Sequence, residues 1–148
     1  MKMVDISKKI VSHRVAEASG TITLKPTTVE IIRKRKVEKG DPLSAAQIAG
    51  LLAAKKTWEM IPMCHNIPLG SVEVRCELRE DSVVVVSRVK AVYKTGVEME
   101  ALVACSIALL TIWDMVKQYE KDELGQYPET KIEDVRIVMK QKERVDQK

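Results

Sequence analysis

At 148 residues, the chain is long enough to bury one hydrophobic core, and its length predicts a single domain. With 45% hydrophobic and 31% charged residues it has the composition of a globular protein, and no suitably flanked run of about eighteen apolar residues predicts a membrane span. The net charge of +4 would favour an anionic ligand without demanding nucleic acid. Residues 1–10 lack an apolar signal core, and the three cysteines fit neither a disulfide framework nor a zinc pattern, so we expect a reducing cytoplasm.

The first part of the chain predicts a strand and a short helix. Residues 14–24 carry apolar side chains typical of an extended segment, in which Gly20 indicates a bulge. Residues 27–30 match a capping box directly after a proline and predict a helix that continues to about residue 36.

A second helix follows the turn at residues 39–42. Asp41 is its expected N-cap, with Pro42 at the first helical position. Residues 43–57 are rich in Ala and Gly, so another backbone can pack closely against this helix. Prolines bracket residues 61–68, which therefore predict an ordered loop rather than a regular helix.

Two strands come next. Apolar and charged residues alternate from residue 72 to residue 79, which is the period of a half-buried strand. Residues 80–82 predict a hairpin turn, and residues 83–92 predict the partner strand.

The longest apolar stretch, residues 94–117, predicts a long helix that opens with a capping box at residues 95–98. No residue between Glu100 and Asp114 is charged, so we expect nearly every face of this helix to be covered by protein. Ionisable groups are confined to its two ends.

The last strand is predicted at residues 132–139, and residues 1–12 and 141–148 are expected to be frayed tails. The resulting order, β-α-(α)-β-β-α-β, is the split βαβ pattern of the ferredoxin-like fold, in the α+β class. It predicts one four-stranded antiparallel sheet with helices on one face, and a single ferredoxin-like domain over residues 1–148.

Two carboxylates, Glu98 and Glu100, lie in the first turn of the long helix. Such a helix start ordinarily attracts phosphate. Two negatively charged carboxylates repel phosphate. They instead suit acid–base chemistry or a ligand edge rich in N–H donors, such as guanine. The structural alternatives are a capping-box partner for Glu98 and a dipole-stabilising surface acid for Glu100.

Asp114 and Lys117 are three residues apart and therefore neighbours on the helix surface. A lysine held by an aspartate can act as a general acid or base if burial shifts its pKa. A surface ion pair at the helix C-terminus is the simpler interpretation, and the sequence alone favours it.

Other polar residues give weaker signals. His65 lies in the proline-bracketed loop, where a lone histidine is more often structural than catalytic, and its neighbour Cys64 has no further ligands for a metal site. Several cations are ordinary surface charges individually but could together hold a polyphosphate: Arg14, Lys39, Lys55 and Lys56.

The two ends of the long helix cannot serve one compact site. Glu100 and Asp114 are fourteen residues apart, which is about 21 Å along the axis, although only about 40° around it. If both ends serve one reaction, the site lies between subunits or the ligand is very long. We favour a site between subunits.

Four segments of the chain, at residues 39–57, 61–69, 94–102 and 108–117, resemble the cyclic pyranopterin monophosphate synthases, the molybdenum cofactor biosynthesis protein C family. The similarity runs from residue 3 to about residue 140. It implies a lyase that converts (8S)-3′,8-cyclo-7,8-dihydroguanosine 5′-triphosphate to cyclic pyranopterin monophosphate and releases diphosphate. It also implies a ferredoxin-like homohexamer, a trimer of dimers, with active sites at subunit interfaces.

The resemblance also assigns site residues. The catalytic residues it implies are Asp114, Lys117 and Lys39. The substrate-binding residues it implies are Met63, Cys64, His65, Glu98, Met99, Glu100, Lys55 and Arg14. The sequence departs from the family at Met63, Val116 and the tail, which lacks the common Gly-Gly-Lys-Ser-Gly ending.

In the mechanism that we expect, Lys117 and Lys39 act as general acid and base while Asp114 orients Lys117. Glu98 or Glu100 accepts N–H bonds from the base-derived ring. Other side chains hold the triphosphate as the sugar 3′-oxygen attacks the α-phosphorus: His65, Arg14 and Lys55. No motif predicts a protein-bound cofactor or metal, although Mg²⁺ could accompany the triphosphate.

Two other classes of function are weighed against this one. The first is a non-enzymatic GTP-binding ferredoxin-like regulatory module, which would bind nucleotide without turnover. The second is an RNA-binding module, which needs aromatic stacking positions. With two Trp, three Tyr and no Phe, the chain supplies few such positions, so no nucleic-acid partner is expected.

Overall fold

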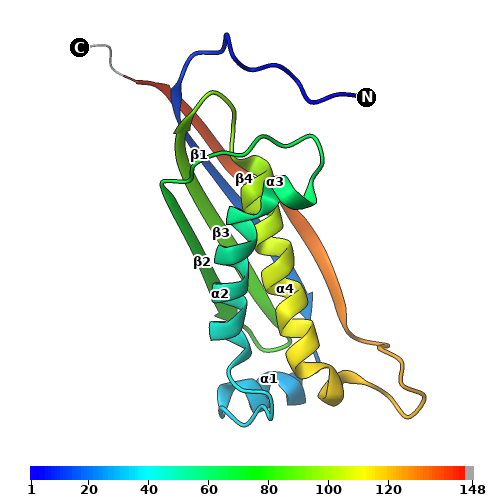
Figure 1. Ribbon diagram of the computed structural model, residues 1–148. Coiled ribbons are helices and arrows are strands. Elements are labelled where there is room, and N and C mark those ends of the chain that lie inside the picture. The colour runs from blue at the N-terminus through cyan, green and yellow to red at the C-terminus, as the bar shows by residue number, and fades with distance from the viewer. Residues whose placement is uncertain (146–148) are drawn as a thin grey trace.

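A four-stranded antiparallel sheet, described with the rest of residues 1–145 in a computed structural model, carries its helices on one face (Figure 1). In chain order the elements are β1 (Ser12–Thr23), α1 (Pro26–Arg33), α2 (Pro42–Lys55), α3 (Thr57–Met60), β2 (Ser71–Leu78), β3 (Ser82–Tyr93), α4 (Glu98–Glu120) and β4 (Lys131–Arg144).

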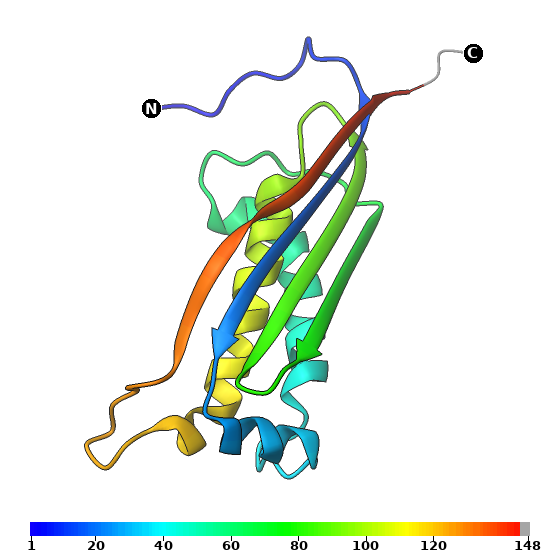
Figure 2. The ribbon, with the colours of Figure 1, turned by 180° about the vertical axis from the view of Figure 1, so that it is seen from behind.

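The strands lie in the order β2-β3-β1-β4, and every neighbouring pair is antiparallel. Figure 2 shows the opposite face of the sheet, which no helix covers. This topology confirms the predicted α+β, ferredoxin-like fold class with its β-α-(α)-β-β-α-β order.

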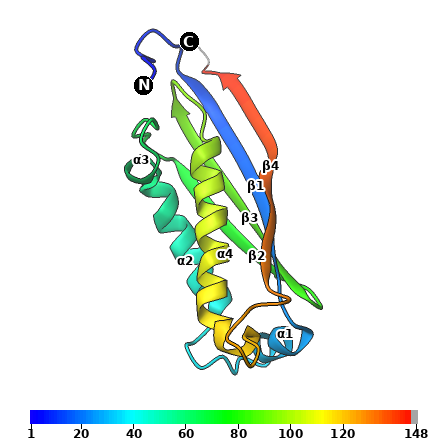
Figure 3. The ribbon, with the colours of Figure 1, turned by 90° about the vertical axis from the view of Figure 1, so that its right-hand side faces the viewer.

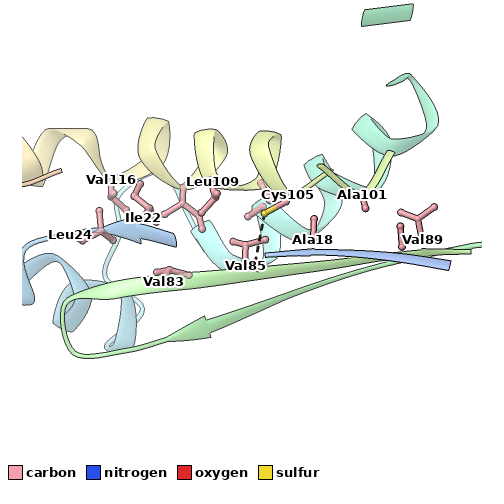
Figure 4. Packing of buried hydrophobic residues seen from close by; sticks show 14 of the residues in the cluster. Ala18, Ile22, Leu24, Val83, Val85, Val89, Ala101, Cys105, Leu109 and Val116 are labelled. Carbon is pink, nitrogen blue, oxygen red and sulfur yellow. Dashed lines mark hydrogen bonds between the residues drawn. The ribbon is translucent and has the colours of Figure 1, made fainter. Parts of the chain in front are cut away.

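The core lies between the sheet and α4, where alternate residues of the central strands point toward the helix. Figure 4 shows Ala18 of β1 and Val85 of β3 facing Cys105 and Leu109 of α4. All four are fully buried, and the Cys105 thiol donates a hydrogen bond to the Val85 carbonyl oxygen at 3.7 Å. Small residues on β1 therefore let α4 lie close to the sheet.

Gly20 is the point of closest approach between β1 and α4. A Cβ atom there would lie 2.8 Å from Leu109 Cδ1 and 2.9 Å from Val135 Cγ2. The predicted irregularity at Gly20 is confirmed, because the pairing of β1 with β4 shifts there. The extra residue belongs to β4, which inserts residues 134–135 opposite the glycine.

Asp41 caps α2 as predicted, and its side chain accepts from the backbone N–H groups of Leu43 and Ser44. Both predicted capping boxes are wrong. Helix α1 starts at Pro26 without a side-chain cap and ends at Arg33 rather than near residue 36. Helix α4 starts only at Glu98, so Thr95 lies too early to cap it.

Glu120, which the sequence did not single out, fixes the start of α1. Its carboxylate is fully buried and accepts hydrogen bonds from the Thr28 hydroxyl, the Thr130 hydroxyl and the Lys25 backbone N–H. The buried carboxylate joins the end of α4 to the start of α1 and to the segment before β4.

The expected frayed tails are partly ordered. Strand β4 continues to Arg144, and its residues 141–144 pair with the first residues of β1, so the prediction is wrong for them. Residues 146–148 lie outside the described part of the chain. Residues 1–11 form no helix or strand, yet Ser7 O accepts a hydrogen bond from the Lys94 ammonium at 3.0 Å.

Gly50 of α2 packs against α4, as the Ala- and Gly-rich sequence predicts. A Cβ atom there would lie 2.8 Å from the Ala104 backbone oxygen. We expect Gly50→Ala to lower the free energy of unfolding by about 1–3 kcal/mol, because the clash outweighs the gain in helix propensity. Denaturant unfolding measures this change.

Gly70→Ala is the matched control, because its Cβ atom would meet nothing closer than 3.5 Å. It should change stability by no more than about 0.5 kcal/mol. A Gly50→Ala variant as stable as the Gly70→Ala variant would contradict the close packing of α2 on α4.

Candidate active site

The predicted site residues gather at the two opposite ends of α4 (Figure 3). The Glu100 cluster, around the start of α4, contains Arg14, Met63, Cys64, His65, Glu98, Met99 and Glu100. The Lys117 cluster, near the end of α4, contains Lys39, Asp114 and Lys117. Lys55 ends α2 at the same end of the molecule as the start of α4 (Figure 1), but within residues 1–145 no hydrogen bond or ion pair joins it to the other predicted residues.

The Glu100 cluster surrounds a small cavity of about 150 Å³. The loop of residues 61–68 forms one wall with Met63, Cys64 and His65, and the first turn of α4 forms the other. Binding pockets for small molecules are ordinarily about 300–1,000 Å³. This cavity can therefore hold only part of a nucleotide-sized ligand within one chain.

The two carboxylates of this cluster have different environments. Partial burial would raise the pKa of Glu98, but the Lys140 ammonium at 2.7 Å, the backbone N–H and the Arg14 charge together hold that pKa below its ordinary value. Glu100 is only 4% exposed, and within residues 1–145 no Lys or Arg pairs with it. Burial, with the negative charge of Glu98, raises the pKa of Glu100.

Glu98 is thus paired with a cation that favours its ionised form, whereas Glu100 has no cation partner in the described part of the chain and is free to accept hydrogen bonds from a ligand. Lys140 was not predicted to be part of the site, because the charged end of the chain was interpreted as a tail.

Arg14 and His65 add donors to the Glu100 cluster. Arg14 is buried; its Nη2 donates to the Lys94 carbonyl oxygen at 3.4 Å, while Nε has no partner in the described part of the chain. His65 Nε2 lies 2.7 Å from the Val4 carbonyl oxygen, so Nε2 carries the proton. Arg14 therefore keeps an unused N–H donor.

The cysteines are thiols rather than thiolates. Burial raises the pKa of Cys105 to about 12 and that of Cys76 to about 11. Burial and the Glu100 charge also raise the pKa of Cys64, which argues against a nucleophile there. Within residues 1–145, no three His, Cys, Asp or Glu side chains are placed to hold a metal ion.

In the Lys117 cluster, one aspartate bridges two lysines. Lys117 Nζ lies 2.9 Å from Asp114 Oδ1, and Lys39 Nζ lies 3.4 Å from Asp114 Oδ2 and 2.9 Å from its carbonyl oxygen. Hydrogen bonds from both lysines lower the pKa of Asp114, and the hydrogen bond with Asp114 raises the pKa of Lys117. Within one chain this is a solvent-facing pair, since the Asp114 side chain is 60% exposed.

An aromatic wall adjoins this cluster. Trp113 and Tyr127 meet edge to face, with ring centroids 5.2 Å apart. They line a hollow of about 410 Å³ with Leu110, Asp114, Lys117 and Ile132. Sequence reasoning missed Tyr127, because a single aromatic residue in an irregular loop carries no periodic signal.

The two clusters are held apart by α4, which runs without a break from Glu98 to Glu120. Glu100 and Asp114 are therefore separated by about 21 Å along the axis, as expected. No compact site of one chain can contain both clusters.

Comparison with known proteins gives a consistent result. The model of the MoaC family matches residues 3–143. The "Probable cyclic pyranopterin monophosphate synthase" of Pyrococcus furiosus is 57% identical over 143 residues, which cover 97% of this chain and 92% of the relative. Relatives with the same name from Sulfolobus acidocaldarius and Sulfurisphaera tokodaii are 59% and 56% identical, over 93% and 99% of this chain and 96% and 97% of their own lengths.

The different environments of the two glutamates predict opposite effects of pH on stability. Since the pKa of Glu100 is raised in the folded state, its ionisation lowers stability as the pH rises through that pKa. Glu100→Gln removes this cost, so its stabilising effect in thermal unfolding should grow as the pH rises from the ordinary value of 4.5 through the raised folded-state pKa.

Glu98→Gln is the matched control. The lowered pKa of Glu98 gives stability that is present above its ordinary value of 4.5 and is lost as the pH falls through the folded-state pKa. This variant should therefore be less stable than the parent at neutral pH. Shifts of the same sign in both variants would contradict the assigned environments.

Proposed function

The chain belongs to the MoaC family, and we propose that it is a cyclic pyranopterin monophosphate synthase. Its substrate would be (8S)-3′,8-cyclo-7,8-dihydroguanosine 5′-triphosphate, and its products cyclic pyranopterin monophosphate and diphosphate, which makes it a lyase. The observation that carries this proposal is identity of 56–59% to relatives of that name over almost the whole chain.

We assign Lys117 the role of proton donor, because Asp114 holds its side chain in place. The hydrogen bond with Asp114 raises the pKa of Lys117, which keeps the ammonium form but makes it a weaker acid, so the reacting atom that takes the proton must be strongly basic. Lys39, bonded to the same aspartate, would provide the second cation or the base. Charge that develops during ring rearrangement and diphosphate release would be stabilised by these two ammonium groups.

The Glu100 cluster would bind the rest of the substrate. Glu100, nearly buried and without a cation partner in the described residues, suits N–H groups of the guanine-derived ring. The unused Nε–H of Arg14 suits a phosphate oxygen, and Lys55 would add a second cation. His65, whose Nε2–H is held by the Val4 carbonyl oxygen, would donate to the triphosphate only with a second proton on Nδ1. Met63, Cys64 and Met99 would shape the cavity beside them. Any Mg²⁺ would arrive with the triphosphate.

We propose that the complete site forms between subunits of a homohexamer, a trimer of dimers. The separation of about 21 Å between the clusters supports this, as does a cavity too small for the whole substrate. The three free cysteines are consistent with a cytoplasmic location. The proposal requires no nucleic acid and no membrane.

Turnover of the cyclic triphosphate tests the activity, followed as diphosphate release and pterin formation. Lys117→Ala should lower kcat/KM by about 10²–10⁴-fold, because it removes the positioned proton donor. Asp114→Ala should lower kcat more than it raises KM, since the aspartate positions Lys117. Lys121→Ala, one turn beyond Lys117 and exposed, is the matched control and should stay within about twofold of the parent.

Full turnover by the Lys117→Ala variant would contradict the site. Binding of the triphosphate by the parent protein without any turnover would favour the alternative function, a GTP-binding regulatory module.

Mixing two defective variants tests whether sites form between subunits. Glu100→Gln damages one cluster and Lys117→Ala damages the other, so a mixed pair would contain one site with both defects and one intact site. With random exchange, about a quarter of all sites should be intact. Recovery of about a quarter of the parent activity is expected, against the baseline of each variant alone.

Subunit exchange must be shown separately, by co-purification of tagged and untagged chains. If the chains exchange and the mixture regains no activity, both clusters do not meet across a subunit interface.

A further inference from the structure

Residues 4–7, which we call the N-terminal strap, form no helix or strand and are held at three points. The Val4 carbonyl oxygen lies 2.7 Å from His65 Nε2, and the Ser7 carbonyl oxygen accepts a hydrogen bond from the Lys94 ammonium at 3.0 Å. Between these two contacts Ile6 is only 9% exposed, whereas every other residue of the range 1–11 is exposed. Figure 3 shows this segment at the end of the molecule where α4 begins.

The strap has a defined shape because it also bonds to itself. Asp5 Oδ1 accepts from the Ser7 backbone N–H at 2.8 Å and from the Ser7 hydroxyl at 2.6 Å, and the Ile6 carbonyl oxygen accepts from the Lys9 N–H at 3.0 Å. The two outward-bonding carbonyl oxygens of the strap thus reach two different parts of the Glu100 cluster. Val4 bonds to the loop of residues 61–68, and Ser7 bonds to the segment just before α4.

The contact with Val4 decides which ring nitrogen of His65 a ligand can use. A neutral imidazole has one N–H donor and one lone pair, on different nitrogens. Because Nε2–H is donated to the Val4 carbonyl oxygen, the lone pair is on Nδ1. Within residues 1–145 no hydrogen bond engages Nδ1, and His65 lines the cavity of about 150 Å³. The nitrogen that remains for a ligand is therefore an acceptor.

We propose that the N-terminal strap is a positioning element of the active site, which holds His65 in the tautomer whose Nδ1 accepts a proton from the substrate. The identity of that substrate rests on the proposed function. A catalytic base is commonly oriented by a third group that bonds to its far side. Here the Val4 backbone carbonyl would take that role, so no second carboxylate is needed behind the histidine.

The release of diphosphate includes a proton that such an acceptor can take. When a substrate hydroxyl attacks the α-phosphorus, its O–H bond breaks and the proton passes to His65 Nδ1. The new O–P bond forms as the bond from phosphorus to the diphosphate oxygen breaks, and the diphosphate leaves with that electron pair. The imidazolium then donates from both nitrogens, and its charge strengthens the hydrogen bond to Val4. Loss of the Nδ1 proton to water restores the starting state.

The strap is held in place by few contacts, which makes it separable from the fold. Each ordered residue of an irregular segment loses backbone entropy, and only contacts such as the burial of Ile6 offset that loss. The segment pairs with no strand of the sheet. A charge at Ile6 should therefore release the strap and leave the sheet and helices folded.

NMR of protein labelled with ¹⁵N-histidine tests the strap without any substrate. A ring N–H that is bonded to a backbone carbonyl is protected from exchange with water, so His65 should give a direct ¹H–¹⁵N signal. The only other histidine, His13, is exposed and should give none. Ile6→Lys should remove the His65 signal, whereas Ile10→Lys makes the same change at an exposed isoleucine and should retain it.

A second variant acts at the other anchor and keeps the test decisive if Ile6→Lys does not fold. Lys94→Met removes the hydrogen bond to Ser7 and should speed exchange of the His65 ring proton by about tenfold. Lys90→Met, at an exposed position of β3, is its control and should leave exchange unchanged. A parent protein without the His65 signal would overturn the strap, and so would a signal that survives in both Ile6→Lys and Lys94→Met.

Turnover of the cyclic triphosphate tests the effect on catalysis. Ile6→Lys should lower kcat by about tenfold or more and change KM less, because His65 is present but no longer oriented. The conservative Ile6→Val should keep the parent values. Since the strap acts through His65, adding Ile6→Lys to His65→Ala should lower the rate of that variant by no more than about twofold. Losses that multiply in the double variant would contradict the positioning role.

The two kinds of readout separate this inference from the proposed function. An enzyme that turns over the triphosphate but lacks the His65 ring signal refutes the strap alone. A parent protein that shows the signal, loses it in Ile6→Lys and turns over no triphosphate refutes the proposed function alone.

Discussion

The close contact between α4 and the sheet is the constraint on which the rest of the structure depends. Ala18 and Gly20 leave room for Cys105 and Leu109, and Gly50 lets α2 approach from the side. A helix held this closely along its length stays straight, so the groups at its ends are fixed in relative position. The core thus determines the separation of the two clusters.

The two ends of α4 carry groups of opposite charge, and the charged side chains at one end are more buried than those at the other. At the start of α4 the loop of residues 61–68 and β1 enclose the carboxylates, which raises the pKa of Glu100. At the other end the charges face solvent, where Asp114 and its lysines stabilise one another. One end accepts N–H groups and the other presents ammonium groups. A polar base joined to a triphosphate requires both kinds of group.

Local sequence patterns predicted the elements well and their ends less well. Alternation predicted β2 and β3, and Asp41 with Pro42 predicted the start of α2, because each signal lies within a few residues. The predicted capping box at residues 27–30 was wrong because α1 already starts at Pro26, where the buried Glu120 carboxylate, far away in sequence, accepts from the Lys25 backbone N–H and the Thr28 hydroxyl. Residues 141–144 look like a charged tail, yet they pair as an edge strand, where charged side chains can face solvent on either side. The site residues came from the family resemblance; geometry then separated them into two clusters.

Helix α4 has more apolar side chains than its own sheet can cover, and some of them, such as Leu110, stay exposed. A core helix needs one apolar stripe, and the buried side of α4 supplies it through residues such as Cys105, Leu109 and Ile112. A second row of side chains on the outward side repeats with the same spacing of four and three residues: Met99, Val103, Ser106, Leu110, Trp113 and Lys117. The two rows lie roughly 110° apart around the helix, so α4 carries apolar side chains beyond those that face the sheet. If both rows are covered by protein, a substitution on the outward row alters assembly and catalysis together while the fold of the chain is preserved.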